Sequence, residues 1–139
     1  MTPTTVAITG FDDLLRAARE EPEPQRLLFV FAGADLPANA TAAQRAAFDA
    51  GESGELAPLM CVDKAADALS DFVALATEAA SAGPPWALVF VAALSGRAGV
   101  PPTSHDAEAP LQHMVDAIKS GRFDGMVPFD RHGAPVRFH

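Results

Sequence analysis

Cysteine is almost absent from this chain, which carries a single one, Cys61, among 139 residues. One cysteine cannot form an internal disulfide, and structural zinc sites need several Cys or His residues at short intervals. The sequence therefore predicts no disulfide, no metal site and no cofactor. Because Cys61 lies within the apolar run 59–62, we expect a buried structural thiol. A nucleophilic role would require the fold to bring His105 or His113 to this thiol.

Basic residues and long apolar runs are also scarce. Lys and Arg number 10 against 18 Asp and Glu, which gives a net charge of −8 and excludes a diffuse attraction to nucleic acid or anionic lipid. The longest apolar run, 86–94, is about half a membrane span. The first ten residues lack the basic and apolar regions of a secretory signal. These absences predict an acidic, soluble, cytoplasmic protein without nucleic-acid or membrane partners.

The length predicts one domain over 1–139, with residues 1–9 loosely attached. Apolar periodicity and breaker residues predict helices over about 11–20, 42–50 and 65–82 and a last helix ending near 120, and strands over 26–32, 58–62 and 86–94. Two apolar segments, 123–130 and 135–138, predict a C-terminal β-hairpin. Asp63 is expected to cap the helix that follows it, and Thr103 or Ser104 the last helix.

The predicted order is αβαβαβαββ, an α/β fold. Alternation of strands and helices favours parallel strands joined by crossovers, so we expect a single mixed, mainly parallel sheet flanked by helices, with the hairpin as an antiparallel edge. The strand over 86–94 is expected to be central, because its apolar content at an edge would promote aggregation.

Polar residues follow each predicted strand, at the position where open α/β sheets bind ligands. They are Asp35 after the first strand, Asp63 and Lys64 after the second, and Ser95, Gly96 and Arg97 after the third. Backbone amides around Gly96, with the cations of Lys64 and Arg97, would attract a small anion. The structural alternative is a tight exit from the strand, with Arg97 paired to a carboxylate.

A second polar cluster, Ser104, His105 and Asp106, contains the residue types of a catalytic triad. Triad members are assembled in space rather than in sequence, however. These residues instead fit the start of a helix, where a hydroxyl caps the backbone and a carboxylate favours the positive end. The sequence therefore indicates no catalytic residue.

Four segments resemble a known family: Gln25–Asp35 (QRLLFVFAGAD), Pro58–Lys64 (PLMCVDK), Val89–Arg97 (VFVAALSGR) and Pro110–Lys119 (PLQHMVDAIK). They are similar to short, uncharacterised proteobacterial proteins that often carry the label ribonucleotide reductase subunit alpha. The resemblance covers most of the chain and implies a bacterial protein, but it supplies no catalytic residues. The label does not fit the chemistry, because nucleotide reduction needs a thiyl-forming cysteine and a redox-active cysteine pair, and this chain has one cysteine.

The sequence thus predicts a non-catalytic binding or accessory protein whose partner is an unknown protein or a second copy of the chain. A purely structural subunit of a complex belongs to the same prediction. The alternative is a small enzyme or ligand-binding domain that takes a phosphate-bearing metabolite at residues 63–64 and 95–97. A concave site around those residues would favour the metabolite, whereas an exposed apolar patch at a sheet edge would favour a protein partner.

Overall fold

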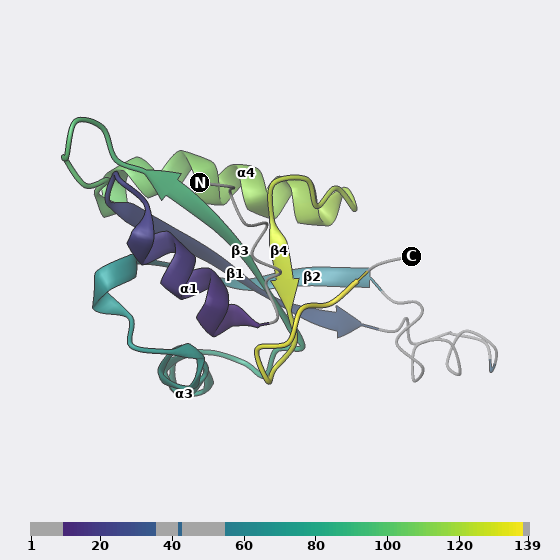
Figure 1. Ribbon diagram of the computed structural model, residues 1–139. Coiled ribbons are helices and arrows are strands. Elements are labelled where there is room, and N and C mark those ends of the chain that lie inside the picture. The colour runs from purple at the N-terminus through teal and green to yellow at the C-terminus, as the bar shows by residue number, and fades with distance from the viewer. Residues whose placement is uncertain (1–9, 36–41, 43–54, 138–139) are drawn as a thin grey trace.

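The computed structural model describes residues 10–35, 42 and 55–137, which form a four-stranded sheet with helices on both faces (Figure 1). In chain order the elements are α1 (Phe11–Glu20), β1 (Gln25–Asp35), β2 (Glu55–Ala65), the 3-10 helix η1 (Ala66–Ala68), α3 (Phe72–Ala82), β3 (Leu88–Ser95), α4 (Ser104–Lys119) and β4 (Val127–Phe129). The strand order is β2-β1-β3-β4. The segment 1–9 and, apart from residue 42, the predicted helix over 42–50 lie outside the described residues.

Each pair of neighbouring strands in this sheet is antiparallel, so the predicted mainly parallel sheet is wrong. The prediction assumed that alternating strands and helices join strands that are adjacent in the sheet. β2 and β3 do run in the same direction, because each is antiparallel to β1. They are not adjacent, however, since β1 lies between them and pairs with both.

The predicted closing hairpin and the third predicted helix are both shorter than expected. The second hairpin strand is reduced to one isolated bridge between Phe129 and Pro135. The helix predicted over 65–82 begins at Phe72, because Asp71 rather than Asp63 caps it. No helix in the described part of the chain is long and apolar enough to cross a membrane.

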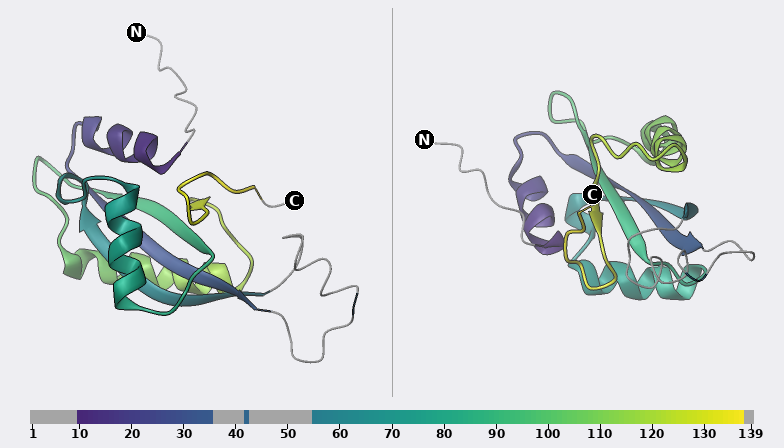
Figure 2. Two further views of the ribbon diagram at one scale, coloured as in Figure 1. Left: turned by 90° about the horizontal axis from the view of Figure 1, so that it is seen from below. Right: turned by 90° about the vertical axis from the view of Figure 1, so that its right-hand side faces the viewer.

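β1 is buried on both faces, which explains its uninterrupted run of apolar residues. Successive side chains alternate between the faces. On one side β1 packs with α1 and α3 through Leu27, Phe29 and Phe31, and on the other with α4 through Leu28, Val30 and Ala32. Figure 2 shows α4 across the sheet from α1 and α3. Three layers result, with the sheet in the middle.

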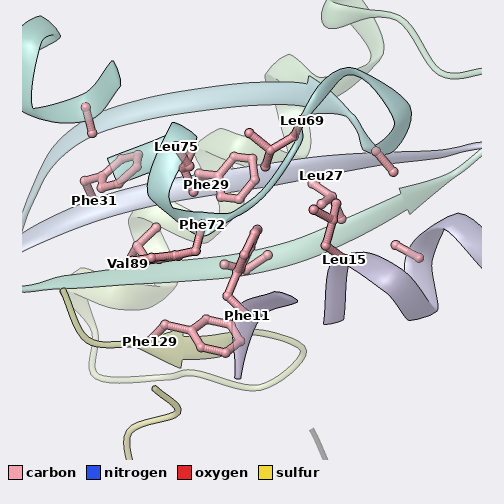
Figure 3. Packing of buried hydrophobic residues seen from close by; sticks show 14 of the residues in the cluster. Phe11, Leu15, Leu27, Phe29, Phe31, Leu69, Phe72, Leu75, Val89 and Phe129 are labelled. Carbon is pink, nitrogen blue, oxygen red and sulfur yellow. The ribbon is translucent and has the colours of Figure 1, made fainter. Parts of the chain in front are cut away.

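Phe11, in the first turn of α1, lies at the centre of the larger core cluster (Figure 3). Its ring centroid is 5.5 Å from that of Phe72, 5.6 Å from Phe129 and 5.9 Å from Phe29. These distances suit tilted and edge-to-face aromatic pairs. One side chain therefore joins α1 to α3, β1 and β4.

The opposite face has its own aromatic pair beneath α4. Phe90 of β3 is fully buried and stacks on Phe123, with ring centroids 5.1 Å apart. At the start of α4, Thr103 and Asp106 form a capping box: the Asp106 N–H donates to Oγ1 of Thr103, and Oδ2 of Asp106 accepts from the Thr103 N–H. The prediction that the 103–106 region initiates a helix is thus confirmed.

Candidate functional site

The antiparallel sheet divides the polar residues that were predicted to gather at strand ends. Asp35 ends β1 at the opposite end of the sheet from the others, because β1 runs against both neighbours. Asp63 and Lys64 do share an end of the sheet with Ser95–Arg97. The start of β1, at Gln25 and Arg26, lies between these two groups. The sequence had not indicated that Gln25 and Arg26 belong to this region.

Asp63 and Lys64, although adjacent in β2, have their partners on opposite faces of the sheet. On the α4 face, Oδ2 of Asp63 accepts from Nε of Arg26 at 2.6 Å and from Oγ of Ser104 at 2.7 Å. The Arg26 Nη2 also donates to that hydroxyl oxygen at 2.7 Å. On the other face, Nζ of Lys64 lies 2.9 Å from Oε2 of Glu78 in α3. Both strand-end charges therefore hold helices against the sheet.

The Asp63 carboxylate is ionised and held within this cluster. Partial burial opposes its ionisation, but the hydrogen bonds from Ser104 and Arg26, with the charges of Arg26 and Lys64, outweigh that effect and lower the pKa of Asp63. The Ser104 hydroxyl donates to the Asp63 carboxylate, whose lowered pKa makes it a weak base, and accepts from the Arg26 guanidinium. We therefore assign a structural role to this cluster: it fastens the start of α4 to β1 and β2.

Replacing Asp63 with asparagine should destabilise the protein by about 1 to 3 kcal/mol at neutral pH, because the half-buried Arg26 loses its charged partner. A carboxyl with a lowered pKa in the folded state stabilises above its unfolded pKa, and that contribution is lost as pH falls through the folded pKa. Urea unfolding should therefore show the wild type and Asp63→Asn converging in acid. Asp67→Asn, at an exposed position, is the matched control; equal losses at all pH values would contradict the assignment.

The backbone amides after β3 are committed within the protein rather than free to bind an anion. The Gly96 N–H donates to the Pro24 carbonyl at 2.8 Å and the Arg97 N–H to the Val100 carbonyl at 3.1 Å. The Gly99 N–H donates to a carboxylate oxygen of Glu23 at 2.7 Å. An anion could use these three amides only by breaking existing hydrogen bonds.

The side-chain environment of Arg97 also disfavours an anion. This residue is exposed and forms no ion pair with a carboxylate of the described residues, so the alternative of a paired Arg97 finds no support either. It borders an open hollow of about 350 Å³ together with Asp106. Backbone and side-chain hydrogen bonds with Thr103 lower the pKa of Asp106, so a fixed negative charge adjoins the space that the anion would occupy.

Gly96 is required for close packing rather than for ligand binding. A Cβ atom added at this position would lie 2.4 Å from the Val100 carbonyl oxygen and 3.1 Å from that of Pro24. Only glycine fits this approach of two backbone segments. The structural alternative of a tight exit from the strand therefore accounts for the glycine.

Cys61 is exposed on β2, so the prediction of a buried thiol is wrong. The apolar run around it suggested a strand covered on both faces, but β2 is an edge strand. Neighbouring atoms still desolvate the sulfur, which raises the pKa of the Cys61 thiol and disfavours the thiolate. No hydrogen bond joins Cys61 to His105 or His113 within the described residues, and His105 instead approaches Glu108 in α4.

The sheet has two edges, and β2 is the longer. An edge strand exposes unpaired backbone groups that can pair with another chain. β2 carries features that hinder such pairing: Pro58 lacks an N–H, the register shifts opposite Phe31 and Ala32, and Lys64 carries a charge. We infer that this edge is protected.

The other edge is open over the second half of β3. β4 pairs only with Val89–Val91, because its first residue, Val127, lies opposite Val91. No strand among the described residues therefore pairs with the outer side of 92–95. Gly125, with φ of 80°, lies two residues before β4, where the chain turns. Had β4 begun earlier, it would have covered this edge.

The alternation of backbone groups shows which residue of β3 faces the open edge. Pro128 has no N–H and its carbonyl accepts from Val136, so its backbone faces away from β3. Phe90, which pairs with Pro128, therefore turns its N–H and C=O away from β4. The next residue, Val91, pairs with Val127 and turns these groups toward β4, and every second residue after it faces the same side of the sheet. The Gly96 N–H, which donates toward β1, obeys the same alternation. Ala93 accordingly presents its N–H and C=O at the open edge.

An open hollow of about 240 Å³ adjoins this edge, between α1, β3 and the start of β4. Its lining is mainly apolar and small, and includes Leu14, Ala17 and Ala18 of α1, Val91 and Ala93 of β3, and Val127 of β4. Glu21 and Gln25 border it toward the end of β3, where Nε2 of Gln25 donates to Oγ of Ser95 at 2.9 Å. We call the hollow and the open backbone of Ala93 the β3 slot.

Sequence reasoning missed the β3 slot because its lining residues come from four segments that meet only in the fold. Gly125 is the single local signal, and a glycine before a strand is too common to reveal where pairing stops. Within the described residues, no group of three His, Cys, Asp or Glu side chains is placed to hold a metal ion.

Comparison of the chain with protein-family models, with curated proteins and with solved structures finds no match. The resemblance to the proteins labelled ribonucleotide reductase subunit alpha therefore stays a prediction. Any statement about function rests on the geometry of this chain.

Proposed function

We propose that this protein is a non-catalytic accessory protein that binds an extended segment of a partner protein in the β3 slot. The single observation that carries this proposal is that the outer side of residues 92–95, beside an apolar hollow, pairs with no strand of the described part of the chain. Strand addition of this kind draws affinity from main-chain hydrogen bonds and specificity from side-chain pockets.

The slot supplies both parts of that recognition mode. Ala93 offers one N–H and one C=O, which a segment lying alongside would engage with a single residue of its own. The side chain of that residue would lie on the same face as Ala93 and reach the hollow beside Ala17 and Ala18. The small size of these alanines leaves room for a side chain from the partner.

Competing sites lack such a combination. The β2 edge is interrupted by Pro58 and a register shift, and the amides beside Arg97 are already bonded. An exposed single cysteine without a disulfide partner suits a reducing compartment, so we place the protein in the cytoplasm as part of the same proposal.

Replacing Ala93 with proline should abolish strand addition while preserving the fold, because the lost N–H faces outward and proline is tolerated on edges. Peptides selected from a displayed library of random 12-residue sequences on the wild type should bind Ala93→Pro at least about tenfold more weakly. Ala93→Ser keeps the N–H and should bind within about twofold. Isothermal calorimetry measures the affinities, and circular dichroism verifies the fold of each variant.

The proposal also predicts which backbone amides respond when a peptide binds. In a ¹⁵N-labelled sample, the amide resonances of Ala93 and Ser95 should shift more than those of β2 on addition of a selected peptide. Peptides that bind Ala93→Pro as tightly as the wild type would overturn the proposal. A dimer in sedimentation that Ala93→Pro dissociates would instead identify a second copy of this chain as the occupant.

A further inference from the structure

One end of the β3 slot is acidic. Glu21, at the C-terminal end of α1, borders the hollow, and the exposed Glu20 precedes it. The C-terminal end of a helix adds a partial negative charge of its own. A cation held at this end would face carboxylates on a protein whose net charge is −8.

The cations nearest in sequence are engaged or lie elsewhere. Arg16 is paired with Asp13, and Arg19 donates to the carbonyls of Ala66 and Leu69. Arg97 borders the separate hollow beside Asp106. No ion pair among the described residues includes the Glu21 carboxylate, so a basic group from outside would complete the slot.

We infer that the β3 slot selects an extended segment in which a lysine or arginine comes two residues before a small or medium apolar residue. This inference rests on the proposed function and names the class of its partner. The segment runs antiparallel to β3, as β4 does, because antiparallel pairs are the more stable kind.

The register of the pairing fixes this spacing. Ala93 and Ser95 lie on the α1 face, opposite Leu27 and Gln25 of β1. An antiparallel segment meets Ser95 first and Ala93 two residues later, and both of its facing side chains point to the α1 side. The first side chain lies near Glu21 and the second enters the apolar part of the hollow.

The test compares selection by four immobilised baits from one displayed library of random 12-residue peptides: the wild type, Glu21→Lys, Glu108→Lys and Ala93→Pro. Glu108 is an exposed glutamate on α4, across the sheet, so Glu108→Lys is the matched control for charge. Wild type and Glu108→Lys should enrich the basic residue two positions before the apolar one. Glu21→Lys should lose that preference and bind the selected peptides about fivefold to tenfold more weakly at low salt.

The outcomes separate this inference from the proposed function. Peptides that require the Ala93 N–H yet show no basic preference, or bind Glu21→Lys unchanged, would overturn the inference and leave strand addition standing. A basic residue two positions after the apolar one would overturn the antiparallel register. Absence of any enriched peptide, or enrichment that Ala93→Pro preserves, would overturn both.

Discussion

Replacing Phe11 with alanine should lower the free energy of unfolding by about 3 to 5 kcal/mol, the largest loss we expect from one substitution on the α1 side. The ring is 1% exposed and contacts Phe29, Phe72 and Phe129, so its removal leaves a cavity that four elements line. Domains of this size are stable by roughly 5 to 15 kcal/mol. Urea unfolding followed by circular dichroism measures the change.

The matched control for this prediction is Val73→Ala. Val73 is a large apolar residue in α3, but its side chain is 70% exposed, and its truncation should change stability by about 0.5 kcal/mol or less. A loss below about 1 kcal/mol for Phe11→Ala would mean that α1 does not cover this face of the sheet. Because α1 forms one wall of the β3 slot, that result would also weaken the proposed function.

Replacing Phe90 with alanine should cost a similar amount, about 3 to 5 kcal/mol, but from the α4 side of the sheet. Phe90 is fully buried and stacks on Phe123. The double variant of Phe90 and Phe123 should be less destabilised than the sum of the single variants by about 0.5 to 1.5 kcal/mol, the usual coupling of an aromatic pair. Denaturant unfolding of the four proteins gives this coupling directly.

Phe11 is the control for the coupling between Phe90 and Phe123, because it lies across the sheet from Phe123. Losses from Phe11→Ala and Phe123→Ala should add within about 0.5 kcal/mol, since the two residues pack in different core clusters. Strong coupling between them would show that the two core clusters are not independent layers. Additivity between Phe90 and Phe123 would contradict their stacking.

The sequence predicted the elements far better than their pairing. The apolar run at 27–31 forms a strand buried on two faces, and so do residues 89–91 of β3, because such runs exceed what an alternating half-buried strand can hold. The sequence predicted a helix end correctly where a side chain caps the backbone, as Thr103 does at the start of α4. The prediction that Asp63 caps a helix was wrong, because a carboxylate after an apolar run can equally remain in its strand and pair with an arginine of the neighbouring strand, here Arg26 of β1.

The candidate site was the least predictable part. Ser95–Arg97 and 63–64 do meet at one end of the sheet, although the expected reason, a parallel sheet, was wrong. The charges of Asp63 and Lys64 and the amide of Gly96 proved to be bonded within the protein, which sequence cannot show because their partners come from other segments of the chain. The Gly99 amide and Glu23, for example, are 76 residues apart.

By itself the sequence determined the secondary structure of most described elements, the acidic charge and the lack of cysteine pairs, because these depend on local residue types and spacing. The tertiary structure alone decided that β1 lies between β2 and β3, that Cys61 is exposed, and that pairing with β4 stops at Val91. These features depend on which strand becomes an edge. Local propensity is the same for a given strand at an edge and in the interior, so edge position is settled only by the packing of the whole chain.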